Sequence, residues 1–158
     1  VKLDQAAIIE GYWEKYQHLR RNKPPANPYT TDHLHPTLDA DGKVAGVSEE
    51  EAQRVHDLGY RKLVGEALWI QRNTGLHSMY ATSMMSKCLC RPSEIAWKAG
   101  LHAMHYMYAN RNTGITYNSH GNLEPVCYYD SGYNQKHLGT RRIVVWAGAR
   151  GSWKGGGA

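Results

Sequence analysis

Several features that would place a protein in a familiar class are missing from this chain of 158 residues. It has no phenylalanine, so its aromatic side chains are 11 tyrosines and 5 tryptophans, whose polar ends suit half-buried positions and interfaces. No apolar run approaches the roughly 18 residues that cross a bilayer, and no signal-peptide pattern is present. We therefore expect no transmembrane helix.

Cysteine is also scarce. The three residues Cys88, Cys90 and Cys127 cannot form an even disulfide framework, which favours reduced thiols in an intracellular compartment over a secreted, disulfide-stapled domain. No second ligand pair accompanies them to form a zinc knuckle, so buried, apolar cysteines are the preferred interpretation. Because the chain begins at Val1, we expect a piece of a longer product or a chain that has lost a leader, such as an organelle presequence.

Acidic residues are unevenly placed. The net charge is +5. Residues 1–50 carry 6 basic and 8 acidic side chains, residues 51–158 carry 13 and 6, and no Asp or Glu follows Asp130. A basic second half fits an acidic partner such as nucleic acid, and a solubilising surface fits it equally well. No Walker loop, dinucleotide fingerprint or Ser-His-Asp arrangement is present.

Apolar spacing predicts helices in the first part of the chain. One is expected over residues 5–19 with Asp4 as its N-cap. Residues 22–47 are rich in Pro and Gly and are read as a long irregular loop. Ser48 with Glu51 three residues later is a capping-box pattern, so a helix should run from there to about residue 72. Its inward stripe would be Val55, Tyr60, Val64, Ala67 and Leu68.

Two further helices are expected to complete a bundle. The first covers about residues 76–89, and the second, capped by Ser93, covers about residues 94–110. Their inward faces would be Leu76, Met79, Tyr80, Ser83, Met84 and Cys88 in the first and Trp97, Leu101, Met104 and Tyr108 in the second. Residues 1–113 are therefore expected to form a small bundle of three to four helices.

The pattern changes after Gly114. Residues 115–117, 123–129 and 142–147 are read as strands separated by Gly, Asn and Ser turns. Residues 114–158 should thus form a short antiparallel β-meander, and the expected fold class is α+β.

Taken in order, the segments resemble the polyprotein of copia-type LTR retrotransposons, from the reverse-transcriptase thumb and connection to the first ribonuclease H strands. Tyr60-Arg-Lys-Leu-Val-Gly-Glu-Ala-Leu-Trp-Ile70 is similar to the thumb helix motif, and Arg91-Pro-Ser-Glu-Ile-Ala-Trp97 to the Pro-Thr-Glu-x-x-Trp helix that follows. Three later segments resemble the first strands of the family's ribonuclease H domain. They are Val126-Cys-Tyr-Tyr-Asp130, Ile143-Val-Val-Trp-Ala-Gly148 and Ser152-Trp-Lys154. One departure is Thr74-Gly-Leu-His77, where the family usually has Thr-Arg-Pro-Asp.

The resemblance implies that the chemistry of the family is missing here. The polymerase needs an adjacent pair of aspartates, which in the family lies upstream of Val1. The ribonuclease H site needs about four carboxylates around two cations, and by resemblance Asp130 would be the first of them. Since no acid follows it, a lone Asp130 cannot hold magnesium tightly. We expect a protein that is not an enzyme, has no cofactor and holds no metal.

Two functions are therefore open. The first is a non-catalytic structural or interaction module, derived from a retrotransposon polymerase and held by other protein chains in a larger assembly. The truncated sheet would then be covered at Val144, Val145, Trp146 and Trp153. The alternative is a thumb fragment that contacts template–primer phosphates. Its basic candidates are Arg61, Lys62, Arg72, Lys87, Arg91 and Lys98.

Histidine pairs offer a weaker metal hypothesis. His33 and His35 would share one face of an extended segment, and His102 and His105 lie one helical turn apart. Neither pair has a third ligand nearby in sequence. A surface loop for the first pair and a position flanking the bundle for the second are the preferred interpretations.

Overall fold

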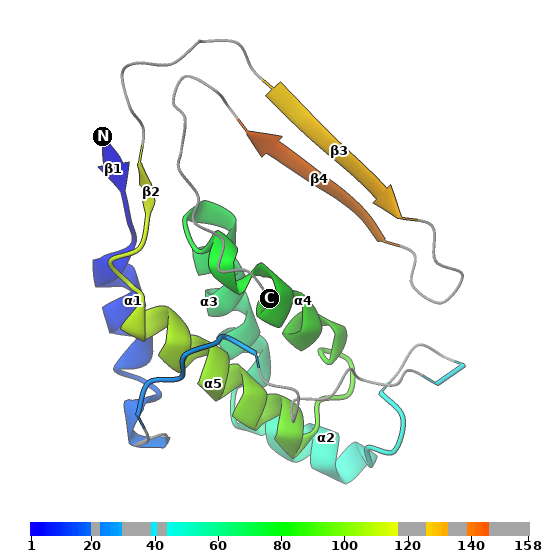
Figure 1. Ribbon diagram of the computed structural model, residues 1–158. Coiled ribbons are helices and arrows are strands. Elements are labelled where there is room, and N and C mark those ends of the chain that lie inside the picture. The colour runs from blue at the N-terminus through cyan, green and yellow to red at the C-terminus, as the bar shows by residue number, and fades with distance from the viewer. Residues whose placement is uncertain (20–22, 30–38, 41–43, 117–125, 133–138, 146–158) are drawn as a thin grey trace. The chain divides into compact units, whose positions relative to one another are not determined.

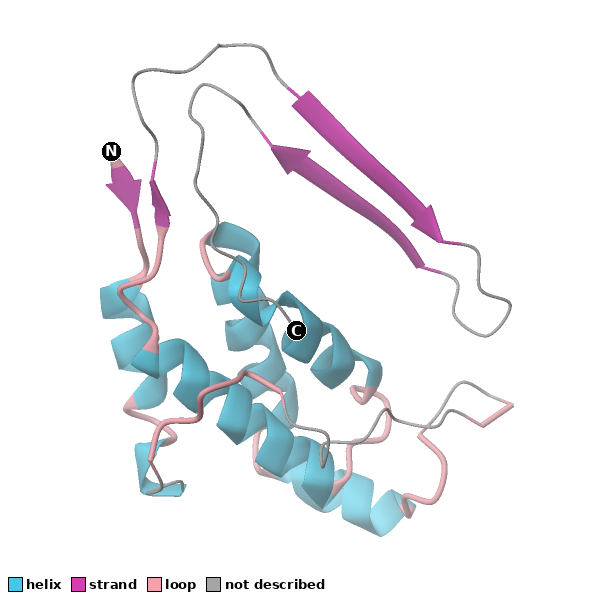
Figure 2. Cartoon of the chain, in the orientation of Figure 1, coloured by secondary structure: helices cyan, strands magenta, loops and turns pink. Residues whose placement is uncertain are grey.

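The computed structural model describes residues 1–19, 23–29, 39–40, 44–116, 126–132 and 139–145 (Figure 1). The described part holds five α-helices, two 3₁₀ turns and four strands, coloured by type in Figure 2. The helices are α1 (Ala6–Trp13), α2 (Glu49–Asp57), α3 (Tyr60–Asn73), α4 (Met79–Lys87) and α5 (Glu94–Ala109). The 3₁₀ turns are Gln17–Leu19 and Leu76–Ser78. The strands are β1 (Lys2–Leu3), β2 (Ile115–Thr116), β3 (Val126–Gly132) and β4 (Gly139–Val145).

The chain divides into two units. Residues 4–114 form the helical unit, and residues 1–3 with 115–158 form the other. In the second unit β1 pairs with β2, and β3 pairs with β4, both antiparallel. The β3–β4 register runs from Val126 opposite Val145 to Gly132 opposite Gly139. The expected α+β class is confirmed. The expected three-stranded meander is not formed by the described residues: the strand expected at residues 115–117 is β2 and pairs with β1, while those expected at 123–129 and 142–147 overlap β3 and β4, which pair with each other. The segment 152–154, which resembles a further strand, lies outside the described residues.

The core of the helical unit forms around α5, which contacts each of the other four α-helices. Residues 100–105 are all buried, so this part of α5 is covered on every side. The inward face expected for this helix, Trp97, Leu101, Met104 and Tyr108, was therefore narrower than the buried surface of α5. Gly100 leaves room for the Leu63 side chain of α3, because a Cβ there would lie 2.7 Å from Leu63 Cδ2. A larger residue at this position would force the Leu63 side chain to move.

The helix expected from Ser48 to about residue 72 is two helices. Ser48 caps α2 as expected, its side chain accepting a hydrogen bond from the Glu51 amide at 3.1 Å. The break comes at Gly59, whose φ of +94° lies in the left-handed region. Val55, Tyr60, Val64 and Ala67 are buried as expected, and Leu68 is half-buried.

Other helix boundaries also differ from expectation. α1 ends at Trp13, and residues 17–19 form a separate 3₁₀ turn. The N-cap of α1 is Gln5 and not Asp4, although the Asp4 carboxylate accepts a bond from the Ala6 amide at 3.3 Å. The helix expected at 76–89 begins with a 3₁₀ turn and is α-helical only over α4. Leu76 and Tyr80, which were expected on the inward face of this segment, are exposed. Ala81 and Met85 are buried instead.

Candidate functional site

The solvent-exposed side of α3 is basic. Arg61, Lys62 and Arg72 are all exposed, and Trp69 between them keeps 54% of its surface open to solvent. Arg61 and Arg72 are eleven residues apart, three helical turns, so they lie on one stripe. Lys62 and Trp69 flank that stripe on the same side. We call Arg61, Lys62, Trp69 and Arg72 the α3 basic face.

The only acidic residue of α3, Glu66, lies one helical turn after Lys62, at the edge of this face. Its side chain is buried, and its two oxygens accept hydrogen bonds from Lys15 Nζ at 2.6 Å and Tyr16 Oη at 2.7 Å. Burial and the bond to Glu66 raise the pKa of Tyr16 well above its usual value of 10.0, so its hydroxyl remains a donor. The negative charge of α3 is thus matched inside the unit, and the exposed side keeps its cations.

A shallow hollow adjoins the α3 basic face. It has a volume of about 380 Å³, and its lining comes from α3 and from the turn after α4: Arg61, Val64, Gly65, Leu68, Leu89 and Cys90. Gly65 is exposed in mid-helix, and a Cβ there would meet no atom within 4 Å. We call this feature the α3 hollow. It is an apolar depression with one guanidinium group in its lining.

The remaining sequence-predicted cations do not join the α3 basic face. Arg91 forms ion pairs with Glu49 and, at 3.9 Å, with Asp39. Lys98 lies on α5 two residues before Gly100, roughly 200° around the helix axis from the residue that packs on α3. Lys87 is exposed at the end of α4, three residues before Cys90 of the α3 hollow.

The candidate site residues of the second unit, residues 1–3 with 115–158, are placed by the pairing of the strands alone. Asp130 lies opposite Arg141, and Val144 and Val145 lie opposite Cys127 and Val126. Trp146 and Trp153 fall outside the described residues.

The histidine and cysteine expectations need two corrections. His102 and His105 are buried inside the bundle, where His102 Nε2 lies 2.8 Å from the Asn27 carbonyl oxygen and His105 stacks on Trp13 with centroids 4.5 Å apart. Cys88 is buried as expected, but Cys90 is exposed because the chain turns outward after α4. His33 and His35 lie outside the described residues. Within the described part, no three His, Cys, Asp or Glu side chains come together as a metal site.

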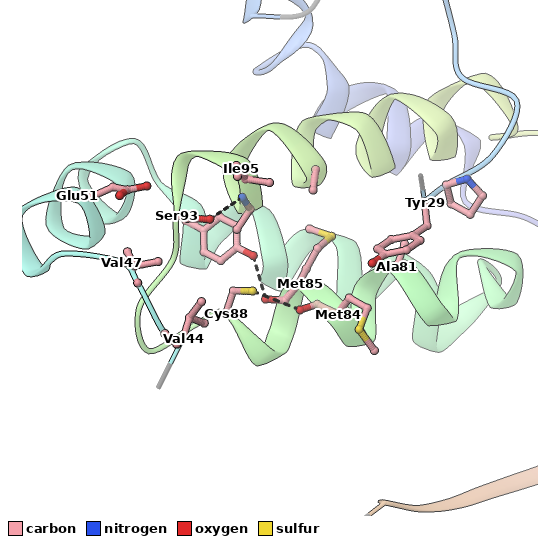
Figure 3. Close-up of a pocket in the computed structure, with 16 residues that line it drawn as sticks. Tyr29, Val44, Val47, Glu51, Ala81, Met84, Met85, Cys88, Ser93 and Ile95 are labelled. Carbon is pink, nitrogen blue, oxygen red and sulfur yellow. Dashed lines mark hydrogen bonds between the residues drawn. The ribbon is translucent and has the colours of Figure 1, made fainter. Parts of the chain in front are cut away.

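An apolar pocket of about 330 Å³ was not predicted from the sequence (Figure 3). Met84, Met85 and Cys88 line it from α4 and its end, Ile95 from α5, and Tyr29, Val44 and Val47 from the loop between α1 and α2. Its polar groups bond to the protein itself: Tyr60 Oη donates to the Met85 carbonyl, and Ser93 Oγ accepts from the Ala96 amide. Glu51 accepts from the Glu94 amide. These groups are engaged in holding the fold, so the described lining offers an apolar surface more than a catalytic centre.

No helix in the described residues is long and apolar enough to span a membrane. Comparison of the chain with family models, with curated proteins and with solved structures found no match.

Proposed function

We propose that the helical unit is a nucleic-acid-binding module, the thumb-like part of a copia-type reverse transcriptase, which carries no catalytic site of its own. The single observation that carries this proposal is the α3 basic face, with three exposed cations on one helix, while the helix's only acid is buried and bonded to Lys15 and Tyr16. The sequence of this same helix is the part that resembles the thumb motif.

The chemistry of the α3 basic face suits a phosphate backbone. Arg and Lys side chains gain affinity for phosphates mainly by releasing condensed counterions, which makes binding independent of sequence and sensitive to salt. Exposed Trp69 adds a flat apolar surface beside the cations, and an indole packs well against sugars and bases. Arg91 contributes little to this surface because Glu49 and Asp39 already pair with it.

The test is the salt dependence of duplex binding. We expect the whole chain to bind a fluorescently labelled DNA duplex, with affinity falling steeply between about 50 and 200 mM salt. Replacing Arg61, Lys62 and Arg72 together by Ala should lower the slope of log K against log salt by about 0.9 for each phosphate that these side chains neutralise in the wild-type complex. Fluorescence anisotropy titrations measure both quantities.

Lys98→Ala is the matched control. It removes one exposed cation from the same unit, on the side of α5 that faces away from α3, and should leave the salt slope unchanged. If the triple variant and Lys98→Ala behave alike, or if the wild-type chain binds no duplex at low salt, the proposal is wrong.

A second candidate is an interaction module held by other protein chains. The observation that favours it is the pairing of β3 and β4, which bond only to each other among the described strands. A two-stranded hairpin is marginally stable by itself, and its outer edges can accept a strand from a partner. This candidate requires a covering chain, with Val144 and Val145 of β4 and the sequence-predicted Trp146 and Trp153 at the contact.

A further inference from the structure

The α3 hollow places an apolar depression directly beside exposed cations. Val64, Leu68 and Leu89 supply aliphatic lining, and Arg61 belongs both to the hollow and to the α3 basic face. A nucleic acid held by the α3 basic face therefore passes the opening of the hollow. A depression of this kind matches a ligand that combines a flat apolar body with a neighbouring negative charge.

An unpaired nucleobase has that combination. Its two faces are apolar and stack on aromatic rings or on the guanidinium plane of an arginine, while its phosphates need cations nearby. A base inside a duplex is already stacked on both sides, so only a base in a single-stranded segment or at an end is free to enter. The basic surroundings provide the charge complementarity.

We propose that the α3 hollow holds one unpaired nucleobase of the bound nucleic acid, so that the preferred ligand is a duplex that continues into a single strand. This inference rests on the proposed function, because the α3 basic face must bind the adjoining phosphates. Gly65 keeps the hollow open. Within a helix, glycine costs roughly 1 kcal/mol relative to alanine, and the open space around it shows that no packing inside the unit requires its small size.

Cys90 provides a direct reporter, since it is exposed and lines the hollow. The whole chain is treated with iodoacetamide alone, with a blunt DNA duplex, and with the same duplex carrying a single-stranded overhang. The DNA concentrations are chosen so that the same fraction of the protein is bound in both complexes, as measured by fluorescence anisotropy. Mass spectrometry then gives the alkylation rate at Cys90 separately from Cys88 and Cys127. We expect the overhang duplex to slow alkylation of Cys90 and the blunt duplex to leave it unchanged.

The affinities give a second measurement. The overhang duplex should bind about tenfold more tightly than the blunt one, as expected for stacking of a single base. Gly65→Leu fills the hollow with a good helix former and should reduce that ratio to about one. Circular dichroism checks that the variant is folded.

The possible results separate the two proposals. Equal protection by both duplexes, or an unprotected Cys90 in the overhang complex, overturns the base site while leaving duplex binding by the α3 basic face intact. If neither duplex binds at low salt, the proposed function fails and the base site fails with it.

Discussion

At the scale of single residues, the burial of Glu66 removes the only acidic side chain of α3 from its exposed surface. Its carboxylate is buried under α3 and accepts bonds from Lys15 and Tyr16, which come from residues 14–19 after α1. A buried carboxylate is tolerated only when it is paired and hydrogen-bonded. The same two contacts fix the segment after α1 against α3 and bury the only acid of that helix, so that its exposed side carries only cations.

Tyr16→Phe tests the contact with the smallest change of shape. The variant keeps the buried ring and removes one hydrogen bond to an ionised acceptor, so the free energy of unfolding should fall by about 1.5–3 kcal/mol. Urea denaturation followed by circular dichroism measures the change. Tyr12→Phe, on the neighbouring turn and half-buried, is the control and should alter stability by less than about 0.5 kcal/mol. Equal effects of the two variants would show that the hydrogen bond from Tyr16 to Glu66 adds nothing to the free energy of unfolding.

Some residue positions could have been predicted more closely from the sequence. Glu66 follows Leu63 by three residues and precedes Ile70 by four, and both are buried, so helical spacing alone puts it on the inner side. What spacing cannot supply is the partner, because Lys15 and Tyr16 lie about fifty residues away in the chain. The outward turn that exposes Cys90 is likewise set by the packing of α4 and α5.

At the scale of elements, two glycines six residues apart should respond oppositely to the same substitution. Gly59 has a φ of +94°, which costs an L-residue about 1–2 kcal/mol. Gly65 is exposed in the middle of α3 with open space around it, where alanine is favoured by about 1 kcal/mol. Gly59→Ala should therefore lower, and Gly65→Ala raise, the urea concentration at the unfolding midpoint. If both variants shift the midpoint in the same direction, the break between α2 and α3 has another cause.

Two helix starts were predicted correctly, and in both a serine is the N-cap. Ser48 and Ser93 cap α2 and α5 as expected, since capping depends on a few adjacent residues. The break at Gly59 was missed because an isolated glycine in an apolar pattern is compatible with a continuous helix. The burial of α5 on all sides was missed because it depends on four other helices that surround it.

At the scale of the whole molecule, the two candidate functions make different demands on the isolated chain. If the hairpin of β3 and β4 needs a partner chain, the full chain should self-associate or aggregate when expressed alone. Residues 4–114 by themselves should stay monomeric, because all side chains of the described hydrophobic core come from this range. Size-exclusion chromatography with light scattering compares the two. A monodisperse, monomeric full chain would count against the interaction module.

The sequence predicted the order and class of the elements, which depend on local periodicity and on turn residues. It did not predict which cations share a surface, since Arg91 and Lys98 are removed from the α3 basic face by an ion pair and by the packing of α5 on α3. The α3 hollow and the apolar pocket depend on loops that meet helices far away in sequence. Such concavities have no signature in a single chain segment.

The pairing of β1 with β2 has a consequence for engineering. Because Leu3 lies opposite Ile115, the polypeptide enters and leaves the helical unit at neighbouring points. Adjacent ends are the condition for transplanting a unit into a loop of another protein or for joining its ends and opening it elsewhere. Residues 4–114 are thus suited to insertion into a loop of a host protein, where they can be studied without the rest of the chain.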